Sequence, residues 1–344
     1  MKVFLGMSGG VDSAVSAYLL QQQGHEVVGV YMKNWSKNLP GMKCPWAEDL
    51  ADAKRVAVKL GIDFRVFDFE AEYKQKVVDY MIAEYQKGNT PNPDIMCNQE
   101  IKFKLFAETA FAEGAEAIAT GHYAKTRGRD LVMAVDVNKD QTYFLYRITP
   151  DVIERTFFPV GDMQKPEVKA LAEQIGLAVA HKPESMGVCF VGEANMRDFL
   201  AEFIETRPGE IRELETNELL GMHDGAIFYT IGQRHGLGLT TGLPFYVVKK
   251  DMDKNIVYVS RTLNSLSLWG DKVTLRDVIL RGHDDQSAPL KLRARIRHRA
   301  PLVDATFDPA TNILTFKEEQ KSLTPGQSVV FYLDDVCLGG GIIA

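Results

Sequence analysis

The first residues whose types and spacing suggest chemistry are Ser8-Gly9-Gly10-Val11-Asp12-Ser13, between a short apolar run and an apolar-periodic segment. Glycine lets a backbone turn sharply and point its N–H groups outward, and the helix that begins near Asp12 adds the positive end of its dipole. A Walker lysine is absent, so Ser8 and Ser13 would supply hydroxyl groups instead. The segment predicts binding of a pyrophosphate group rather than transfer of a terminal phosphoryl group. The plainer alternative is a glycine turn with an ordinary helix N-cap.

Cys97 is the first candidate nucleophile. It follows the rigid run Thr90-Pro91-Asn92-Pro93-Asp94 and lies at or just before the start of a predicted helix. The helix dipole, Lys102 and Lys104 would favour its thiolate form. Asp94, three residues earlier, offers a general acid or base. The alternative is a buried cysteine that only fills the start of the helix.

Cys189 is the second candidate, in a short apolar run between Gly187 and Gly192. By itself it favours a core cysteine. Together with Cys97 and a nucleotide loop, it predicts a sulfur carrier, because one cysteine can hold a persulfide and a second can release the sulfur by forming a disulfide. Cys44 and Cys337 have no supporting neighbours. The wide spacing of the cysteines predicts no structural zinc site.

Composition places few limits on function. The chain has 344 residues, of which 45% are hydrophobic and 25% charged, which is typical of a globular protein of two or three domains. No apolar run approaches the ~20 residues that cross a bilayer, and the N-terminus enters a strand at once, so we expect a cytoplasmic protein without a membrane segment. The net charge of −6 argues against a uniformly basic surface but not against a local basic face.

Hydrophobic periodicity predicts two kinds of architecture. Expected strands cover residues 1–7, 27–32, 64–69 and 115–120, and expected helices cover 12–23, 47–60, 73–86, 98–113, 141–147, 166–175 and 195–205. This alternation predicts a doubly wound parallel sheet. Beyond residue 207, short β-rich runs separated by turns predict small barrels of a kind that often bind oligonucleotides. The predicted fold class is α/β plus all-β: a catalytic domain over 1–205, a small central β domain over 206–266 and a C-terminal β-barrel over 267–344.

One basic segment predicts RNA binding without any family information. Cations recur at every second position, with apolar residues between them, so a single strand would present five cations on one face. Such a face suits a phosphate backbone, although charge also protects exposed strand edges. These cations are Lys291, Arg293, Arg295, Arg297 and Arg299.

Nine motifs together resemble the bacterial tRNA-specific 2-thiouridylases, members of the N-type ATP pyrophosphatase superfamily, over essentially the whole chain. The motifs are GMSGGVDS (6–13), MKNW (32–35), TPNPD (90–94), CN (97–98), TGHY (120–123), KDQ (139–141), GVCF (187–190), GQR (232–234) and GGG (339–341). The resemblance implies that ATP activates C2 of the wobble uridine in tRNAs for glutamate, glutamine and lysine, and that sulfur then displaces AMP. The matches depart from the family at Glu184-Ser185-Met186, where Asp-Ser-Thr is common, and at His298, where an aromatic is usual.

The resemblance also implies roles for single residues. Cys97 would be the nucleophile, with Asp94 beside it, and Cys189 would carry the persulfide. The ATP contacts would be Gly6, Met7, Ser8, Gly9, Gly10, Val11, Asp12, Ser13, Met32 and Gly121, with Asp12 also holding Mg²⁺. The target base would meet Asn92, Pro93 and Asp94. The remaining tRNA contacts would be His122, Lys139, Asp140, Gln141, Arg297, His298 and Gln327. A lone histidine such as His122 is also often structural.

The leading hypothesis is therefore an ATP-dependent tRNA sulfurtransferase. It would be a cytoplasmic monomer that receives persulfide sulfur from a sulfur-relay protein or a cysteine desulfurase. A second hypothesis is a pyrophosphatase-type synthetase that adenylates a small molecule and gives the cysteines no role. A third is a non-catalytic RNA-binding protein whose two cysteines form a redox switch, which leaves the glycine loop unexplained.

Overall fold

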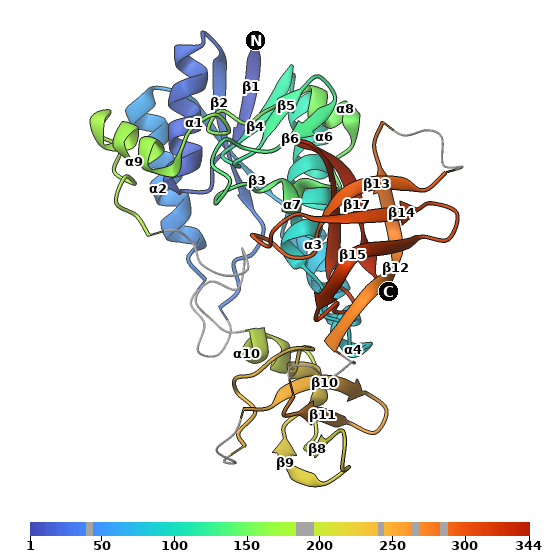
Figure 1. Ribbon diagram of the computed structural model, residues 1–344. Coiled ribbons are helices and arrows are strands. Elements are labelled where there is room, and N and C mark those ends of the chain that lie inside the picture. Colours follow the sequence, from blue (N-terminus) through green and yellow to red (C-terminus); the bar gives the residue numbers. More distant parts are fainter. Residues whose placement is uncertain (39–43, 184–195, 240–243, 263–267, 283–287) are drawn as a thin grey trace. The chain divides into compact units, whose positions relative to one another are not determined.

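The computed structural model describes residues 1–38, 44–183, 196–239, 244–262, 268–282 and 288–344 (Figure 1). Cys189 and the rest of its predicted loop lie outside these residues. The chain divides into two compact units. The first comprises Met1–Val78, Pro93–Ala194 and Tyr332–Gly339, and the second comprises Asp79–Asn92, Asn195–Phe331 and Gly340–Ala344. None of the described helices combines the length and apolar character needed to cross a membrane.

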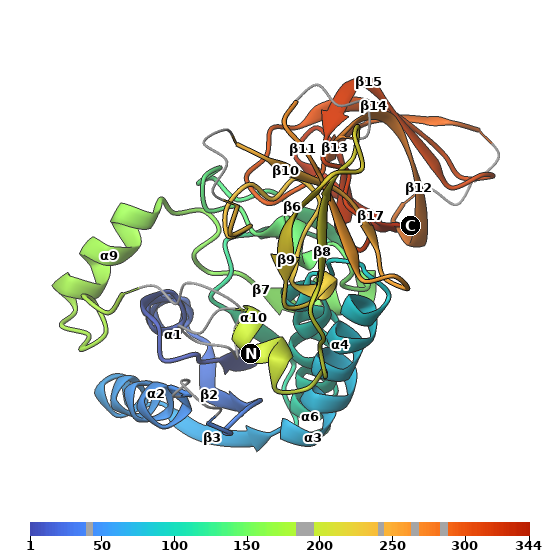
Figure 2. The ribbon, with the colours of Figure 1, turned by 90° about the horizontal axis from the view of Figure 1, so that it is seen from below.

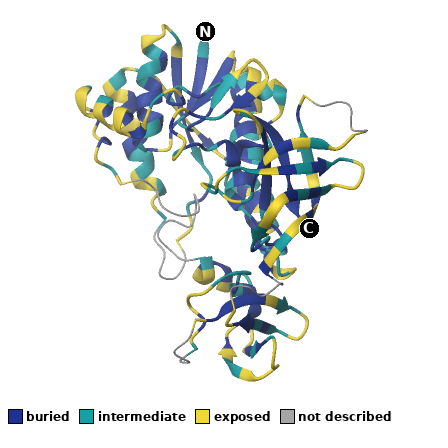
Figure 3. Ribbon diagram, viewed as in Figure 1, coloured by how far each residue is buried: buried dark blue, intermediate teal, exposed yellow. Residues whose placement is uncertain are grey.

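A five-stranded sheet of order β3-β2-β1-β4-β7 forms the centre of the first unit, and all its pairings are parallel. Its strands are β1 (Lys2–Gly6), β2 (Glu26–Lys33), β3 (Asp63–Asp68), β4 (Ala117–Thr120) and β7 (Thr156–Phe157). Strands β1 and β4 are buried on both faces, as is typical of parallel sheets (Figure 3). The predicted parallel sheet is confirmed, and its order reverses between β1 and β4.

Helices cover both faces of this sheet. In Figure 2, α1 (Val11–Gln22), α2 (Trp46–Leu60) and α9 (Lys165–Gln174) lie on one side of the strands, and α3 (Glu70–Tyr73) and α6 (Phe106–Ala112) lie on the other. The shorter helices are α5 (Pro93–Met96), α7 (Thr142–Leu145) and α8 (Pro150–Glu154). Two helices predicted as continuous contain π-helical segments, at Lys74–Val78 and Cys97–Leu105. Helix α4 (Asp79–Gln86), which follows the first of them, belongs to the second unit.

A hairpin that periodicity did not predict completes the first unit. It consists of β5 (Lys125–Arg127) and β6 (Asp130–Val132), which are too short to show a pattern in the sequence. Strand β6 pairs with the C-terminal strand β17 (Val336–Ile343), through Val336↔Val132 and Cys337↔Leu131. This pairing explains why residues near the C-terminus belong to the first unit.

The second unit is rich in β-structure, as predicted. Besides α4, it contains α10 (Met196–Ala201) and a four-stranded sheet of order β10-β11-β8-β9 around a core that includes Ile211 and Val257. The sheet strands are β8 (Gly209–Glu213), β9 (Leu219–His223), β10 (Tyr246–Asp251) and β11 (Ile256–Ser260). The C-terminal region forms a six-stranded barrel closed by pairing of β12 with β17. The other barrel strands are β12 (Trp269–Leu280), β13 (Leu290–Arg295), β14 (Val303–Asp308), β15 (Ile313–Lys321) and β16 (Ser328–Leu333). The predicted barrel is confirmed; the domain boundaries at 205 and 266 stay predictions.

The predicted strand with five cations on one face is wrong. Strand β13 ends at Arg295, and only Lys291 and Arg293 are exposed within it. Arg295 is only 7% exposed. It directly follows the buried Ala294, so the alternation of buried and exposed side chains breaks where the strand ends. Arg297 and Arg299 lie in the following turn, and Arg299 adopts a φ of +63°.

Candidate active site

The segment after β1 is a compact loop organised by Ser13. The Ser13 hydroxyl donates to the Gly10 carbonyl (3.1 Å) and accepts from the Ser8 amide (3.2 Å). Ser13 is 4% exposed, whereas Ser8 is exposed. Gly10 is extended (φ −98°, ψ 165°) and precedes the first turn of α1, so the loop leads directly into a helix N-terminus. That geometry suits an anion, with the Ser13 hydroxyl holding the loop rather than the ligand.

Glycines let three other elements approach this loop. Gly9 has a φ of +76°, and a Cβ there would overlap the Asp49 carbonyl of α2. Gly121 directly follows β4, and its Cβ would lie 2.6 Å from the Ser13 amide nitrogen. A Cβ on Gly6 would lie 2.8 Å from the Met32 Cε of β2. The loop therefore lies where the strand order reverses, which is the usual ligand-binding edge of an open α/β sheet.

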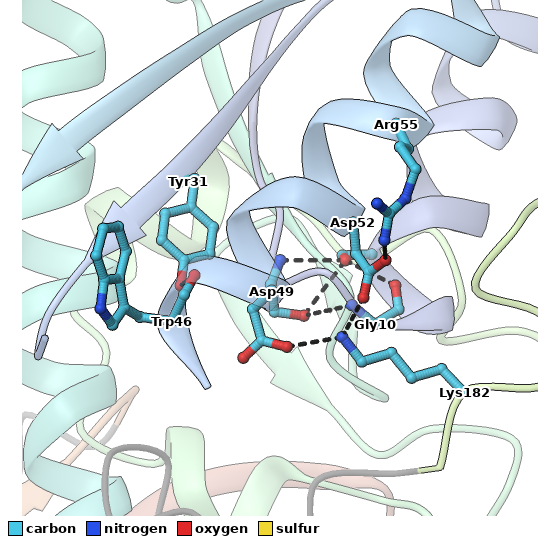
Figure 4. Close-up of polar contacts among 9 residues, drawn as sticks. Gly10, Tyr31, Trp46, Asp49, Asp52, Arg55 and Lys182 are labelled. Carbon is cyan, nitrogen blue, oxygen red and sulfur yellow. Dashed lines mark hydrogen bonds and ion pairs between the residues drawn. The ribbon is translucent and has the colours of Figure 1, made fainter. Parts of the chain in front are cut away.

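A cluster of charged side chains lies beside Gly10 (Figure 4). It consists of Asp49, Asp52 and Arg55 of α2 together with Lys182. The Lys182 Nζ donates to Asp49 Oδ1 (2.7 Å) and Asp52 Oδ2 (2.5 Å), and Arg55 also pairs with Asp52. Burial alone would lower the pKa of Lys182, but the hydrogen bonds that its ammonium donates to both carboxylates outweigh burial and hold that pKa above its ordinary value. Burial would likewise raise the pKa of Asp52, but Lys182 and Arg55 hold it below its usual range. The cluster ties residue 182 to the helix that contacts the loop.

A lysine from a distant helix reaches Asp12. The Lys165 Nζ lies 2.6 Å from Asp12 Oδ1, across 153 residues of sequence, and the Tyr123 hydroxyl donates to the same oxygen (2.9 Å). Lys165 is the first residue of α9 and is only 6% exposed. The Lys165 ammonium group therefore lies beside this loop, although the loop itself contains no lysine. Neither Lys165 nor the role of Tyr123 was predicted from the sequence, because nothing in the spacing of these residues connects them to Asp12.

Asp12 is suited to a magnesium ion that is shared with nucleotide phosphates. Mg²⁺ in such sites is usually held by one or two carboxylates together with the phosphates and water. Both described contacts of Asp12 use Oδ1, and its side chain is 30% exposed at the loop. Among the described residues, no group of three or more His, Cys, Asp or Glu side chains could hold a metal by itself.

The position of Cys97 differs from the prediction. The helix begins at Pro93 with α5, so Cys97 lies one turn inside it, where the π-helical segment starts. The dipole effect is confined to the first turn, so it favours the Cys97 thiolate less than predicted. Lys104 pairs with Glu100 (3.4 Å), which reduces its effect further. Cys97 is 1% exposed, and Asp94 is partly exposed on α5, three residues earlier on the same helix.

His122 follows β4 at the same edge of the sheet as Gly121. Its Nδ1 lies 2.8 Å from the Thr120 hydroxyl, and its ring contacts those of Phe103 and Phe158. Burial, together with the charge of Lys102, lowers the pKa of His122 well below its ordinary value. The imidazole is therefore neutral at physiological pH, so it can donate one hydrogen bond and accept another without carrying charge.

The predicted tRNA contacts at 139–141 form part of an ordered segment. Asp140 is 1% exposed and accepts hydrogen bonds from the Ala134 amide (3.1 Å) and the Thr142 hydroxyl (2.8 Å). Its carboxylate is thus engaged inside the segment. The side chains of Lys139 and Gln141 are partly exposed.

The remaining predicted contacts lie in the second unit or at its border. The Gln327 side-chain amide donates to the Thr90 carbonyl (2.8 Å), and the Arg297 guanidinium donates to the Ser322 carbonyl (2.9 Å). His298 and Asn92 are partly exposed, whereas Pro93 is buried.

Three family profiles match the chain in order. They are the tRNA methyl transferase HUP domain over residues 1–193, the tRNA methyl transferase PRC-barrel domain over 197–261 and the aminomethyltransferase beta-barrel domain over 271–343. A solved complex of a 4-thiouridine synthetase with RNA and bound ATP is 20% identical, with a TM-score of 0.39, and the match covers 58% of this chain and 50% of that chain.

Curated relatives match over the full length. The tRNA-specific 2-thiouridylase MnmA of Listeria monocytogenes is 43% identical over 351 residues, which cover 100% of this chain and 94% of that protein. The protein of the same name from Mannheimia succiniciproducens is 46% identical over 357 residues, which cover 99% of this chain and 91% of that protein. Identity at this level over the whole length shows that the chain belongs to the tRNA-specific 2-thiouridylase family.

Proposed function

We propose that this protein is an ATP-dependent tRNA sulfurtransferase. It adenylates the C2 oxygen of the wobble uridine and replaces that oxygen with sulfur, releasing pyrophosphate and AMP. The observation that carries the proposal is the loop after β1, which places backbone amides, a helix N-terminus and Asp12 together at the ligand edge of the sheet. This arrangement suits the phosphates of ATP, and membership of the family indicates the acceptor.

Residues of the first unit would carry out the adenylation step. The loop amides hold the phosphates, and Gly6, Met32 and Gly121 allow the close approach that shapes the site. Magnesium, held by Asp12, would offset charge on the departing pyrophosphate. The uridine enters beside Asp94, flipped from its stack because C2 is otherwise inaccessible. Its C2 oxygen bonds to the α-phosphorus, pyrophosphate leaves, and Asp94 accepts the proton released from N3.

The sulfur step uses both candidate cysteines. The terminal sulfur of a persulfide on Cys189 attacks C2, and AMP leaves with the former C2 oxygen. Cys97 then attacks Cys189 Sγ, so that the S–S bond breaks and its electron pair goes to the sulfur bonded to C2. The products are 2-thiouridine and a Cys97–Cys189 disulfide, which a cellular thiol must reduce before the next cycle.

The proposal includes partners. A persulfide-donating relay protein or a cysteine desulfurase would load Cys189, and the tRNAs for glutamate, glutamine and lysine would be the acceptors. Residues Asn92 and Pro93 would meet the target base. The other tRNA contacts would be His122, Lys139, Gln141, Arg297, His298 and Gln327, with Asp140 acting through the segment that it holds. We expect a monomer that works in the cytoplasm with its tRNA substrate.

The profile names mention methyl transfer, but the residues favour sulfur transfer. A pyrophosphate-type loop suits cleavage of ATP between its α and β phosphates. The full-length relatives also carry the thiouridylase name. The test is to incubate the protein with Mg-ATP, a cysteine desulfurase supplied with cysteine as the persulfide source, a thiol reductant and an unmodified glutamate tRNA transcript. The products 2-thiouridine and AMP are measured by mass spectrometry.

Cysteine variants separate the proposal from its alternatives. Cys97→Ala and Cys189→Ala should form less than about a hundredth of the 2-thiouridine, in line with loss of a covalent nucleophile. Cys44→Ala, at a partly exposed cysteine given no role, is the matched control. AMP without 2-thiouridine in the unaltered protein would support the adenylation step and show that the sulfur donor or the RNA is wrong. Neither product would favour the small-molecule synthetase or the non-catalytic RNA-binding protein. Full thiolation by both cysteine variants would refute the sulfur step.

A further inference from the structure

Tyr123 joins Asp12, at the loop after β1, to the segment 134–141 through hydrogen bonds of its side chain and its backbone. Its hydroxyl donates to Asp12 Oδ1 (2.9 Å). Its amide donates to Gln141 Oε1 (2.8 Å), and its carbonyl accepts from the Gln141 amide (2.8 Å). Tyr123 is 2% exposed, so its position is set by packing as well as by these bonds. A displacement of the Asp12 carboxylate would therefore also displace Gln141, because Tyr123 is bonded to both residues.

Lys165 makes a second connection between the same two places. Its ammonium group lies 2.6 Å from Asp12 Oδ1, and its backbone amide donates to Asp136 Oδ2 (3.0 Å). The other oxygen of Asp136 accepts from the amides of Asn138 (3.1 Å) and Lys139 (3.2 Å). The first turn of α9 thus bridges Asp12 and the backbone next to Lys139.

Burial makes both connections stiff. Lys165 is 6% exposed and Asp136 is 5% exposed, and Asp140 inside the segment is 1% exposed. Buried charges and polar groups that lose their partners cost free energy, so these groups move together rather than separately. The ammonium of Lys165 also lies 5.6 Å from the centre of the Tyr123 ring, which brings the two connections into contact.

We propose that Tyr123 and Lys165 are positioning residues that couple nucleotide binding at Asp12 to the order of residues 134–141. The proposal rests on the proposed function for the identity of the nucleotide and for the tRNA contacts at Lys139 and Gln141. A nucleotide that fixes the Asp12 carboxylate also fixes Tyr123 and Lys165, and both residues hold the segment. Nucleotide therefore strengthens tRNA binding, and tRNA strengthens nucleotide binding by the same factor.

The test measures amide hydrogen exchange of residues 134–141 with and without an α,β-methylene analogue of ATP plus Mg²⁺. Binding of the analogue is measured separately by calorimetry, with and without tRNA. In the unaltered protein the analogue should slow exchange in the segment, and tRNA should tighten analogue binding by about fivefold or more. Tyr123→Phe and Lys165→Met should still bind the analogue but lose the slowed exchange and the effect of tRNA.

Two matched variants control for the chemical change alone. Tyr31→Phe removes a tyrosine hydroxyl that bonds the Trp46 carbonyl, outside these connections. Lys169→Met removes an exposed ammonium from the same helix as Lys165. Both should keep the coupling. Exchange rates in β1 and β2 report whether each variant is folded.

The outcomes distinguish this inference from the proposed function. Analogue binding that leaves exchange in 134–141 unchanged overturns the coupling and leaves the function standing. Retention of the full tRNA effect in folded Tyr123→Phe and Lys165→Met also overturns it. A protein that binds no analogue at all overturns the proposed function, and the coupling with it.

Discussion

Gly121→Ala should impair nucleotide binding through one added methyl group. Gly121 has no positive φ, so alanine meets no backbone strain there and the effect is purely steric. The new Cβ would lie 2.6 Å from the Ser13 nitrogen, 2.8 Å from the Asp12 carbonyl carbon and 2.9 Å from the Ser13 Cα. All three are backbone atoms of the first turn of α1, which cannot rotate away as a flexible side chain would.

The size of the effect follows from these distances. Non-bonded carbon contacts are comfortable near 3.5–4.0 Å, so the end of β4 and the start of α1 must separate by roughly 1 Å. Overpacking of this kind costs about 1–3 kcal/mol of unfolding free energy. A shift of about 1 Å at a reacting centre can also cost about a hundredfold in rate. Because the shift occurs at Asp12 and Ser13, both ATP affinity and pyrophosphate release should fall.

The assay combines urea unfolding, calorimetry with ATP and pyrophosphate release in the presence of tRNA. Gly270→Ala is the matched control, because its Cβ would approach nothing closer than Leu323 Cδ1 at 3.4 Å, at the end of a flexible side chain. The control should keep its stability and ATP affinity. Unchanged ATP affinity in Gly121→Ala, together with unchanged stability, would refute the steric reasoning. Lost stability with normal ATP affinity would keep the packing argument and remove this loop from the nucleotide site.

Three further measurements address charges. Lys182→Met should lower the unfolding free energy by about 1–2 kcal/mol, a value limited by solvent screening, because it leaves Asp49 and Asp52 beside each other without the ammonium. Since the pKa of Asp52 is lowered in the fold, its contribution is present above the ordinary aspartate pKa and is lost as pH falls through the lowered value. The loss of stability on acidification should therefore be smaller in Lys182→Met than in the unaltered protein, and an equal loss in urea titrations across pH would contradict the assignment. His122 should remain neutral near pH 7, because burial and the charge of Lys102 lower its pKa, so its NMR signals should not titrate near the ordinary pKa of histidine; a midpoint at that ordinary value would contradict the lowered pKa. Arg293→Ala removes an exposed cation of β13 and should reduce the salt dependence of tRNA binding by about one phosphate contact, whereas an unchanged slope would place the RNA elsewhere.

Features that depend on neighbouring residues were predictable from the sequence. Apolar periodicity predicted the strands β1, β2, β3 and β4 and the helices α1, α2 and α9, because a strand or helix repeats its buried face within a few residues. The two-residue strand β7 was not predicted, because it is too short to show a pattern. The glycine loop was also predictable, since its turn and its helix N-terminus are local properties. Motif chemistry likewise indicated Cys97 and Asp94 as a pair, but it predicted Asp94 in an extended loop before the helix, whereas both residues are helical.

The residues that reach Asp12 from far along the chain follow from tertiary packing. The ammonium of Lys165 reaches Asp12 across 153 residues because α9 packs beside α1, and no local pattern records that contact. The short hairpin β5–β6 exists because β6 pairs with β17 from the far end of the chain. Arg295 is buried where β13 ends, although alternation predicted it outside. Periodicity describes how a segment divides its own faces, whereas the partner of each charged group and the end of each strand depend on segments that meet only after folding.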